Sequence, residues 1–227
     1  MDISLNYYEQ GSGFPLILLH GNGEDMTYFT HQIDVFSRAF RVIAVDSRGH
    51  GRTPRGQAPF TIRQFAEDLK CFMDTHAIEK THILGFSDGG NVAMCFALNY
   101  PERVQKLILN GANLFPRGVK ASAQIPITLE YYMARLLSKK RPEMMQQAEL
   151  LGLMVNDPYI KPKKLAAIYH PTLVIAGDRD LIKESHTRLI YNSLPNARLA
   201  IIPGNHAVAA ENPQAFNEAV WAFLLEA

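Results

Sequence analysis

The sequence is poor in the features that mark several classes of protein. It has two cysteines, Cys71 and Cys95, among 227 residues, too few for a disulfide framework. Its 23 basic and 22 acidic side chains leave a net charge of +1, and no basic run is longer than residues 139–141. A nucleic-acid-binding surface is therefore not expected. The apolar run at residues 14–19 is too short to span a bilayer.

These absences favour one globular domain with a sizeable core, and 47% hydrophobic and 20% charged residues fit that class. The first four residues lack the basic start and apolar stretch of a secretory leader. We therefore expect a reduced, cytoplasmic protein with no membrane or nucleic-acid partner. The eight histidines show no metal-ligand spacing, so we expect neither a metal nor a cofactor. The oligomeric state stays open.

Strand-length apolar runs alternate with helical patterns along most of the chain. Strands are expected at residues 3–8, 15–20, 40–46, 81–86, 104–110, 172–176 and 198–202. Helices are expected at residues 26–38, 61–76, 88–100, 184–193 and 213–225. Several strands are apolar at consecutive positions, as in parallel strands that are buried on both faces. The pattern predicts an α/β fold, with a mostly parallel, twisted sheet of about seven strands and helices on both faces.

Residues 114–169 break this alternation, because they hold no good strand and show helical periodicity at 127–137 and 143–154. We interpret them as a short helical lid inserted into a core formed by residues 1–113 and 170–227. The alternative is an elaborated crossover that packs on one face of the sheet.

The lid helices carry more apolar residues than a helix with one face in water needs. Some of these side chains are expected to line an acyl pocket, although such residues at helical spacing also form ordinary cores. The candidates are Ile127, Leu129, Tyr131, Tyr132, Met133, Met144 and Met145. From this set we select Tyr132 and Met133 as substrate-binding residues.

A glycine-bracketed serine follows the expected strand 81–86 and opens a helix. Residues 85–89 read Gly-Phe-Ser-Asp-Gly, which matches G-x-S-x-G in the strand–turn–helix context that a nucleophile requires. A serine on such a sharp turn projects its hydroxyl, and the flanking glycines allow strand and helix to approach. Ser87 is therefore a candidate nucleophile. The alternative is a tight turn in which Ser87 caps the following helix.

Polar residues follow three other expected strands at the edge where open α/β sheets build their sites. The turn His-Gly-Asn-Gly at residues 20–23 offers the backbone N–H of Asn22 to an oxyanion, and the N–H of Asp88 is the expected second donor. Asp178 and Asp180 follow strand 172–176, and His206 follows strand 198–202.

With these motifs, the chain resembles the α/β-hydrolase fold family over essentially its whole length. Ser87, Asp180 and His206 stand in the order Ser…Asp…His of that family. Residues 46–51, Asp-Ser-Arg-Gly-His-Gly, are similar to its D-x-R-G-x-G turn. The family's G-x-x-D pattern selects Asp180 rather than Asp178 as the acid of the triad. The family's sheet usually has eight strands, and here the first is expected to be missing or vestigial.

The resemblance implies a carboxylesterase-like serine hydrolase that acts on a small carboxylic ester, thioester or activated amide. Ser87 is then the catalytic nucleophile, His206 the base and Asp180 the acid. Two alternatives remain: a carbon–carbon bond hydrolase, and a ligand-binding signalling protein on the same fold.

The carboxylate of Asp88 has two interpretations. Residues 87–90 are similar to the serine loop of valacyclovir-hydrolase-like amino-acid-ester hydrolases. Asp88 could therefore bind a cationic substrate group at the rim of the pocket. The other interpretation is that Asp88 only stabilises the start of its helix through the helix dipole.

Overall fold

The computed structural model describes residues 2–226, and its sheet has the predicted seven strands. They lie in the order β1-β3-β2-β4-β5-β6-β7. The strands are β1 (Tyr7–Gln10), β2 (Phe14–Leu19), β3 (Phe40–Val45), β4 (Thr81–Phe86), β5 (Val104–Asn110), β6 (Thr172–Gly177) and β7 (Ala197–Ile202). Edge strand β1 is antiparallel to β3, and the other neighbouring strands are parallel. The predicted α/β fold is confirmed.

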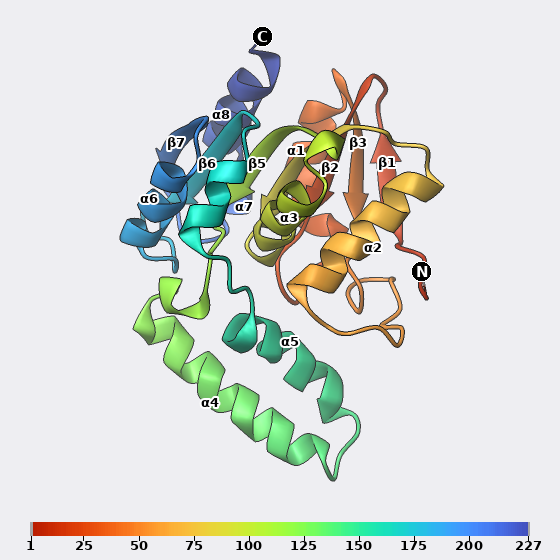
Figure 1. Cartoon of the computed structure of the whole chain (residues 1–227), viewed down its shortest axis with the longest axis vertical. Coiled ribbons are helices and arrows are strands. Elements are labelled where there is room, and N and C mark those ends of the chain that lie inside the picture. The colour runs from red at the N-terminus through yellow and green to blue at the C-terminus, as the bar shows by residue number, and fades with distance from the viewer. Residues whose placement is uncertain (1, 227) are drawn as a thin grey trace.

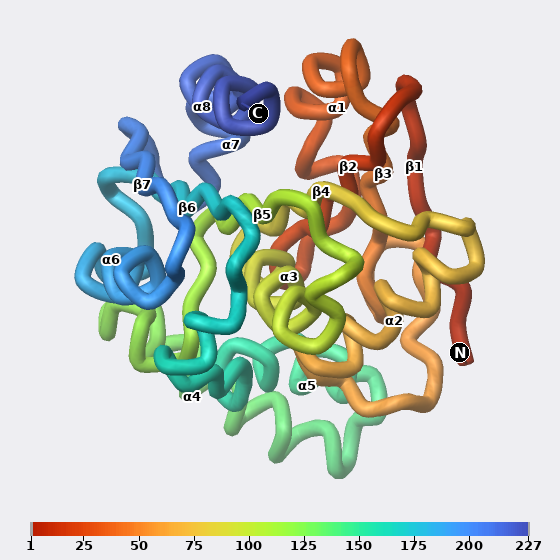
Figure 2. Tube along the Cα trace, turned by 45° about the horizontal axis from the view of Figure 1, so that its top comes forward, coloured from red at the N-terminus to blue at the C-terminus, as the bar shows by residue number. Residues whose placement is uncertain are grey.

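Helices cover both faces of the sheet (Figures 1 and 2). The α-helices are α1 (Thr30–Phe36), α2 (Ile62–Thr75), α3 (Asp88–Asn99), α4 (Ala121–Ser138), α5 (Met144–Asn156), α6 (Glu184–Ser193), α7 (Val208–Glu211) and α8 (Pro213–Leu225). The 3-10 helices are η1 (Met26–Phe29), η2 (Pro101–Arg103), η3 (Pro116–Gly118) and η4 (Pro162–Ala167). The helix expected at 26–38 is therefore divided into η1 and α1.

Strand β2 fills two separate cores because its side chains alternate between the faces of the sheet. Leu16 and Leu18 lie in the core that α1 and α8 cover. Ile17 and Leu19 lie in the core that α2, α3 and α6 cover. The helices above and below the strands in Figure 2 are these two layers. A strand buried on both faces explains why the sequence there is continuously apolar.

The first strand begins later than predicted, at Tyr7 rather than at residue 3. Asn6 explains the difference, because its N–H bonds to a side chain in the loop after β3 and not to a strand. Its N–H donates to Thr53 Oγ1 at 2.8 Å, and its carbonyl accepts from the N–H of Asp46 at 2.9 Å. Ile3 and Leu5 are buried all the same. Their apolar character therefore reflects packing against the loop after β3 and not membership of the sheet.

The segment between β5 and β6 carries the helical hairpin of α4 and α5, which lies away from the sheet at the bottom of Figure 1. Both helices are longer than predicted. They pack on each other through Ala134, Ala148 and Leu151. Within residues 2–226, no helix combines the length and apolar character needed to cross a bilayer.

Three buried histidines resist protonation. Burial lowers the pKa of His20, His82 and His186 from 6.5 to about 4. His82 lies in β4 with its ring centroid 4.7 Å from Phe14 and 5.6 Å from Phe40. Its Nδ1 atom has no hydrogen-bond partner within the described part of the chain.

We predict that the free energy of unfolding falls as the pH drops from about 6.5 to about 4. The unfolded chain binds protons on these histidines that the folded protein excludes, so each costs about 1.4 kcal/mol per pH unit. His82→Phe keeps an aromatic ring against Phe14 and should remove one histidine's contribution to the pH dependence of the free energy of unfolding. Urea unfolding at about pH 7, 6 and 5 measures this slope in the wild type and in the variant. An unchanged slope in the variant contradicts the prediction.

Candidate active site

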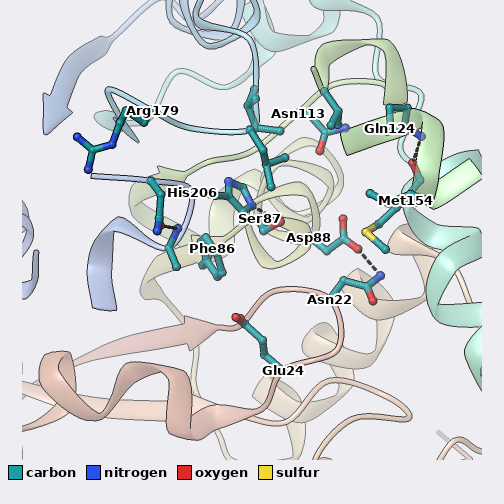
Figure 3. Close-up of a pocket in the computed structure, with 16 residues that line it drawn as sticks. Asn22, Glu24, Phe86, Ser87, Asp88, Asn113, Gln124, Met154, Arg179 and His206 are labelled. Carbon is teal, nitrogen blue, oxygen red and sulfur yellow. Dashed lines mark hydrogen bonds between the residues drawn. The ribbon is translucent and has the colours of Figure 1, made fainter. Parts of the chain in front are cut away.

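Ser87 occupies a strained turn between β4 and α3. Its φ angle of +52° lies in the left-handed region, which residues other than glycine seldom adopt. Its side chain makes no capping hydrogen bond to the helix. The hydroxyl instead borders a cavity outside the carboxyl edge of the sheet (Figure 3). The turn therefore presents Ser87 in the manner that the G-x-S-x-G pattern predicts, and the helix-capping alternative is wrong.

The two bracketing glycines are required by space. A Cβ atom on Gly85 would lie 2.3 Å from the carbonyl oxygen of Gly89. A Cβ atom on Gly89 would lie 2.1 Å from the carbonyl oxygen of Leu19 in β2. Both distances are far below van der Waals contact, so the start of α3 packs against β4 and β2 only where side chains are absent.

The structure brings the three residues of the predicted triad together. His206 Nε2 lies 2.9 Å from Ser87 Oγ, and His206 Nδ1 lies 2.7 Å from Asp180 Oδ1. Asp180 is buried, and its Oδ1 also accepts a hydrogen bond from the N–H of Ile182 at 2.8 Å. The imidazole is thus held between the hydroxyl and the carboxylate. Gly111 leaves space for it, since a Cβ atom there would lie 2.8 Å from His206 Cε1.

Asp178, the other acid after β6, does not contact His206. Its side chain is 47% exposed and lies beside Arg179. Its Oδ1 accepts from the N–H of Gly204 at 2.9 Å and so braces the loop that carries His206. The geometry therefore favours Asp180 as the partner of the imidazole.

Two backbone amides near Ser87 have no protein acceptor. Within residues 2–226, neither the N–H of Asn22 nor that of Asp88 donates a hydrogen bond. Asp88 is the first residue of α3, where an N–H group lacks an intrahelical acceptor. Both residues border the same cavity as Ser87. They are thus available to a substrate oxygen.

The carboxylate of Asp88 is buried and held by amide groups. Its Oδ2 accepts from Asn22 Nδ2 at 2.9 Å (Figure 3), and its Oδ1 accepts from Asn91 Nδ2 at 3.0 Å. Burial raises the pKa of Asp88, while the two amides oppose that shift. Each oxygen has one amide donor and keeps capacity for another, so the interpretation of Asp88 as a receptor for a cationic substrate group stays a prediction. Asn91 was not among the residues predicted from the sequence. Its position one helical turn after Asp88 on α3 is a spacing at which two side chains can bond.

The cavity beside Ser87 has a volume of about 450 Å³. The core and the helical insertion both contribute to its walls. The apolar lining residues are Phe86, Val119, Ile127, Met154, Leu181, Ile182 and Ala207, and the remaining ones are Asn22, Glu24, Ser87, Asp88, Asn113, Gln124, Arg179, Asn205 and His206.

The selection of Tyr132 and Met133 as substrate-binding residues needs correction. Neither lines the cavity, and each is 58% exposed on the outer side of α4. Ile127 is the one member of the predicted set that lines it. Tyr131 and Met144 pack between α4 and α5, and the remaining two, Leu129 and Met145, are exposed. Helical spacing in the sequence identifies the apolar faces of α4 and α5, but it does not indicate which of these faces lines the cavity.

Two acidic side chains, Glu24 and Asp88, border the cavity together with one cation, Arg179. Glu24 accepts from the N–H of Gly21 at 3.2 Å, and no cationic nitrogen of residues 2–226 lies within ion-pair distance of its carboxylate. Burial raises the pKa of Glu24. Arg179 is 64% exposed and already pairs with Asp178 and Glu211.

No group of three or more His, Cys, Asp or Glu side chains within the described residues is arranged to hold a metal ion. Cys95, one of the two cysteines, is half-buried, and burial raises the pKa of its thiol to about 11. A reactive thiolate is not expected there.

Comparisons with known proteins agree with this architecture. A family model described as "alpha/beta hydrolase fold" matches residues 15–142. A carbamate hydrolase named RutD, from Caulobacter sp. (strain K31), is 31% identical over 92% of this chain and 90% of its own length. A 2-hydroxy-6-oxononadienedioate/2-hydroxy-6-oxononatrienedioate hydrolase from Burkholderia vietnamiensis (strain G4 / LMG 22486) is 30% identical over 98% of this chain and 91% of its own length.

Among solved structures, a hydrolase from Pseudomonas aeruginosa PA01 matches with a TM-score of 0.80 and 27% identity. The match covers 99% of this chain and 95% of that one. The chain therefore belongs to the α/β-hydrolase fold family, as its motifs indicated. The relatives named above are hydrolases, which supports an enzyme of this class.

We predict that Gly89→Ala destabilises the protein by about 3 kcal/mol, because the added methyl group overlaps the carbonyl of Leu19. Gly152→Ala is the matched control. Its Cβ atom would lie 3.3 Å from the tip of Tyr131, and alanine is the better helix former, so stability should stay the same or rise by up to about 1 kcal/mol. Urea unfolding compares the two. Equal stability of both variants would show that α3 tolerates displacement from β2.

Proposed function

We propose that the protein is a serine hydrolase that cleaves a small, uncharged ester-like substrate through an acyl-enzyme. One observation carries the proposal: the hydrogen-bonded chain Ser87–His206–Asp180 ends beside a cavity of about 450 Å³. The substrate class covers carboxylic esters, thioesters and activated amides, and the relatives named as carbamate hydrolases support including carbamates.

In the acylation step, Ser87 Oγ attacks the substrate carbonyl while His206 Nε2 takes the hydroxyl proton. Asp180 holds the other imidazole nitrogen protonated and stabilises the imidazolium that forms. The proton then passes from His206 to the leaving group, and the acyl group remains on Ser87. The 2.9 Å contact between Ser87 Oγ and His206 Nε2 is suitable for the first proton transfer, and the 2.7 Å contact to Asp180 holds the imidazole in the tautomer that accepts this proton.

The negative oxygen of the tetrahedral intermediate needs preorganised donors. We assign this role to the backbone N–H groups of Asn22 and Asp88, which lack protein acceptors and border the cavity. A water molecule activated by His206 then attacks the acyl carbonyl and releases the acid, with the same two amides stabilising the second intermediate.

We further propose that residues 114–169 act as a lid that forms the acyl side of the pocket. Val119, Gln124, Ile127 and Met154 from this segment line the cavity opposite the core. The flexible side chain of Met154 suits acyl groups of different shape. Excluding water there strengthens each polar contact to the reacting carbonyl.

The charge of the cavity distinguishes among the activities named for the relatives. A dioate carries two carboxylates, whereas the cavity beside Ser87 already holds two acidic side chains, Glu24 and Asp88. The cation at the rim, Arg179, is paired with Asp178 and Glu211. Burying two more negative charges there without cations is costly. Carbon–carbon cleavage of a dicarboxylate is therefore less favoured than cleavage of a neutral acyl substrate.

We predict that Ser87→Ala and His206→Ala each lower kcat by roughly 10⁴–10⁶ and leave the fold intact. Asp180→Asn should lower kcat by roughly 10⁴, because the amide favours the wrong imidazole tautomer. The measurement is steady-state hydrolysis of p-nitrophenyl esters of graded chain length, with circular dichroism to check folding. Wild-type protein that releases nitrophenol only once per molecule would indicate a ligand-binding protein instead of an enzyme.

Asp178→Asn is the control for the choice of acid. Asp178 is exposed and does not contact His206, so we expect kcat within about threefold of wild type. A loss in Asp178→Asn that matches the loss in Asp180→Asn would move the assignment to Asp178.

We predict that the protein prefers a neutral ester over an isosteric ester that carries a carboxylate on its acyl chain. Repulsion from Glu24 should give about a tenfold difference in kcat/KM, which corresponds to about 1.4 kcal/mol. Glu24→Gln should narrow the difference by raising kcat/KM for the anionic ester. Equal kcat/KM values for both esters in the wild type would remove Glu24 as a determinant of substrate charge.

A further inference from the structure

The side-chain amide of Asn22 joins three parts of the site. One of its N–H groups donates to Asp88 Oδ2 at 2.9 Å, and the other donates to the backbone carbonyl of Leu150 at 2.8 Å. Asn22 lies in the loop after β2, Asp88 begins α3, and Leu150 belongs to α5 of the helical insertion. Figure 3 shows Asn22 reaching Asp88 beside the cavity.

The hydrogen-bonded chain continues on the other side of Asp88. Asn91 Nδ2 donates both to Asp88 Oδ1 and to Asn113 Oδ1, each at 3.0 Å. Asn91 Oδ1 accepts from the backbone N–H of Asn113 at 2.9 Å. Asn113 follows β5 and borders the cavity. Four side chains thus connect the loops after three neighbouring strands, β2, β4 and β5.

A buried carboxylate is a demanding way to build this connection. Burial opposes the charged form of Asp88, and the hydrogen bonds from the Asn22 and Asn91 amides stabilise that form. The start of α3 does not need this charge, because uncharged residues also satisfy helix N-termini. The carboxylate bonds instead to Asn22, and Asn22 and Asp88 are the two residues beside the cavity whose backbone N–H groups lack protein acceptors, which suggests a role in the site.

We propose that the side chains of Asn22 and Asp88 form a brace that sets the spacing of the two oxyanion donors and ties that spacing to the position of α5. This inference rests on the proposed function, since it concerns the same two backbone amides. Asn22 and Asp88 are positioning residues here through their side chains, in addition to the role assigned to their backbones. The side-chain amide of Asn22 donates both to Asp88 in the core and to Leu150 in the insertion. Movement of α5 therefore shifts Asn22 and disturbs the oxyanion site.

The first test removes the brace with Asn22→Ala. The backbone N–H remains but loses its support, so we expect kcat to fall about 10–100-fold with KM changed by less than about threefold. An aryl boronic acid, which forms a tetrahedral adduct with the serine, should bind more weakly by a similar factor.

The matched control is Asn217→Ala. Asn217 is buried, whereas Asn22 is half-buried, and like Asn22 it makes two side-chain hydrogen bonds, accepting from Gln32 Nε2 and donating to the carbonyl of His31, both at 3.0 Å. It joins α1 to α8 away from the cavity. We expect this variant to lose stability like Asn22→Ala but to keep wild-type kcat.

The second test exchanges the two partners. Asn22→Asp alone places two carboxylates together and should lower kcat more than Asn22→Ala does. In the double variant Asn22→Asp with Asp88→Asn, the amide at position 88 donates to the carboxylate at position 22, and its oxygen still accepts from Asn91. The double variant should therefore recover at least tenfold in kcat over Asn22→Asp. It should remain below wild type, because the carboxylate at position 22 cannot donate to Leu150.

The outcomes separate the inference from the proposed function. If wild-type protein hydrolyses none of the esters, or Ser87→Ala is as active as wild type, the proposed function fails. If Ser87 is required but Asn22→Ala keeps kcat and boronic-acid affinity while losing stability, the brace is only structural and the inference is wrong. Failure of the double variant to recover activity also overturns it.

Discussion

The arrangement of the active site depends on how closely α3 approaches the sheet. Gly89 has no side chain, and its backbone therefore lies against the carbonyl of Leu19 at the end of β2. That approach brings the first residues of α3 beside the loop after β2. The amides of Asn22 and Asp88 consequently lie on the same cavity as Ser87, and the Asn22 side chain reaches the Asp88 carboxylate. One steric constraint thus positions the nucleophile, the proposed oxyanion donors and the brace.

Three carboxylates near Ser87 have three different environments. Asp180 accepts from His206 and from the N–H of Ile182, so it supports the imidazole. Asp88 is held by two amides, with no cation beside it. Glu24 has only a backbone donor and faces the cavity. Environment therefore distinguishes the three acids, and neither Asp88 nor Glu24 is paired with a cation among the described residues.

Much of the fold was predictable because the relevant signals are local. Strands buried on both faces carry runs of consecutive apolar residues, and β4 and β5 occupy the predicted residues. The glycines around Ser87 are visible as a pentapeptide because their spacing reflects the turn itself. Asp180 and His206 follow strands β6 and β7, and parallel strands deliver such residues to one edge. The boundary error at residues 3–6 arose because burial and strand pairing look alike in the sequence.

The partners of Asp88 and the orientation of the insertion were not predictable in this way. Asn22 and Asn113 are distant in the sequence from Asp88 and Asn91, so no spacing rule pairs the side chains of Asn22 with Asp88 or of Asn113 with Asn91. The outer face of α4 carries Tyr132 and Met133, which are as apolar as a core face. Only the packing of α4 against α5 decides that these two side chains point away from Ser87.

The insertion's own small core has a consequence for specificity. Ala134, Ala148 and Leu151 hold α4 and α5 together, while Leu153 anchors α5 in the core that α2, α3 and α6 cover, so the packing of α4 on α5 depends on the hairpin's own contacts. The hairpin's inner residues, such as Ile127 and Met154, are therefore free to vary with the acyl group while Ser87, His206 and Asp180 stay in place. The contact between the Asn22 amide and Leu150 limits this freedom, since it links the hairpin to the proposed oxyanion donors. Changes in the acyl wall are compatible with catalysis only when they leave the backbone of α5 at hydrogen-bond distance from Asn22.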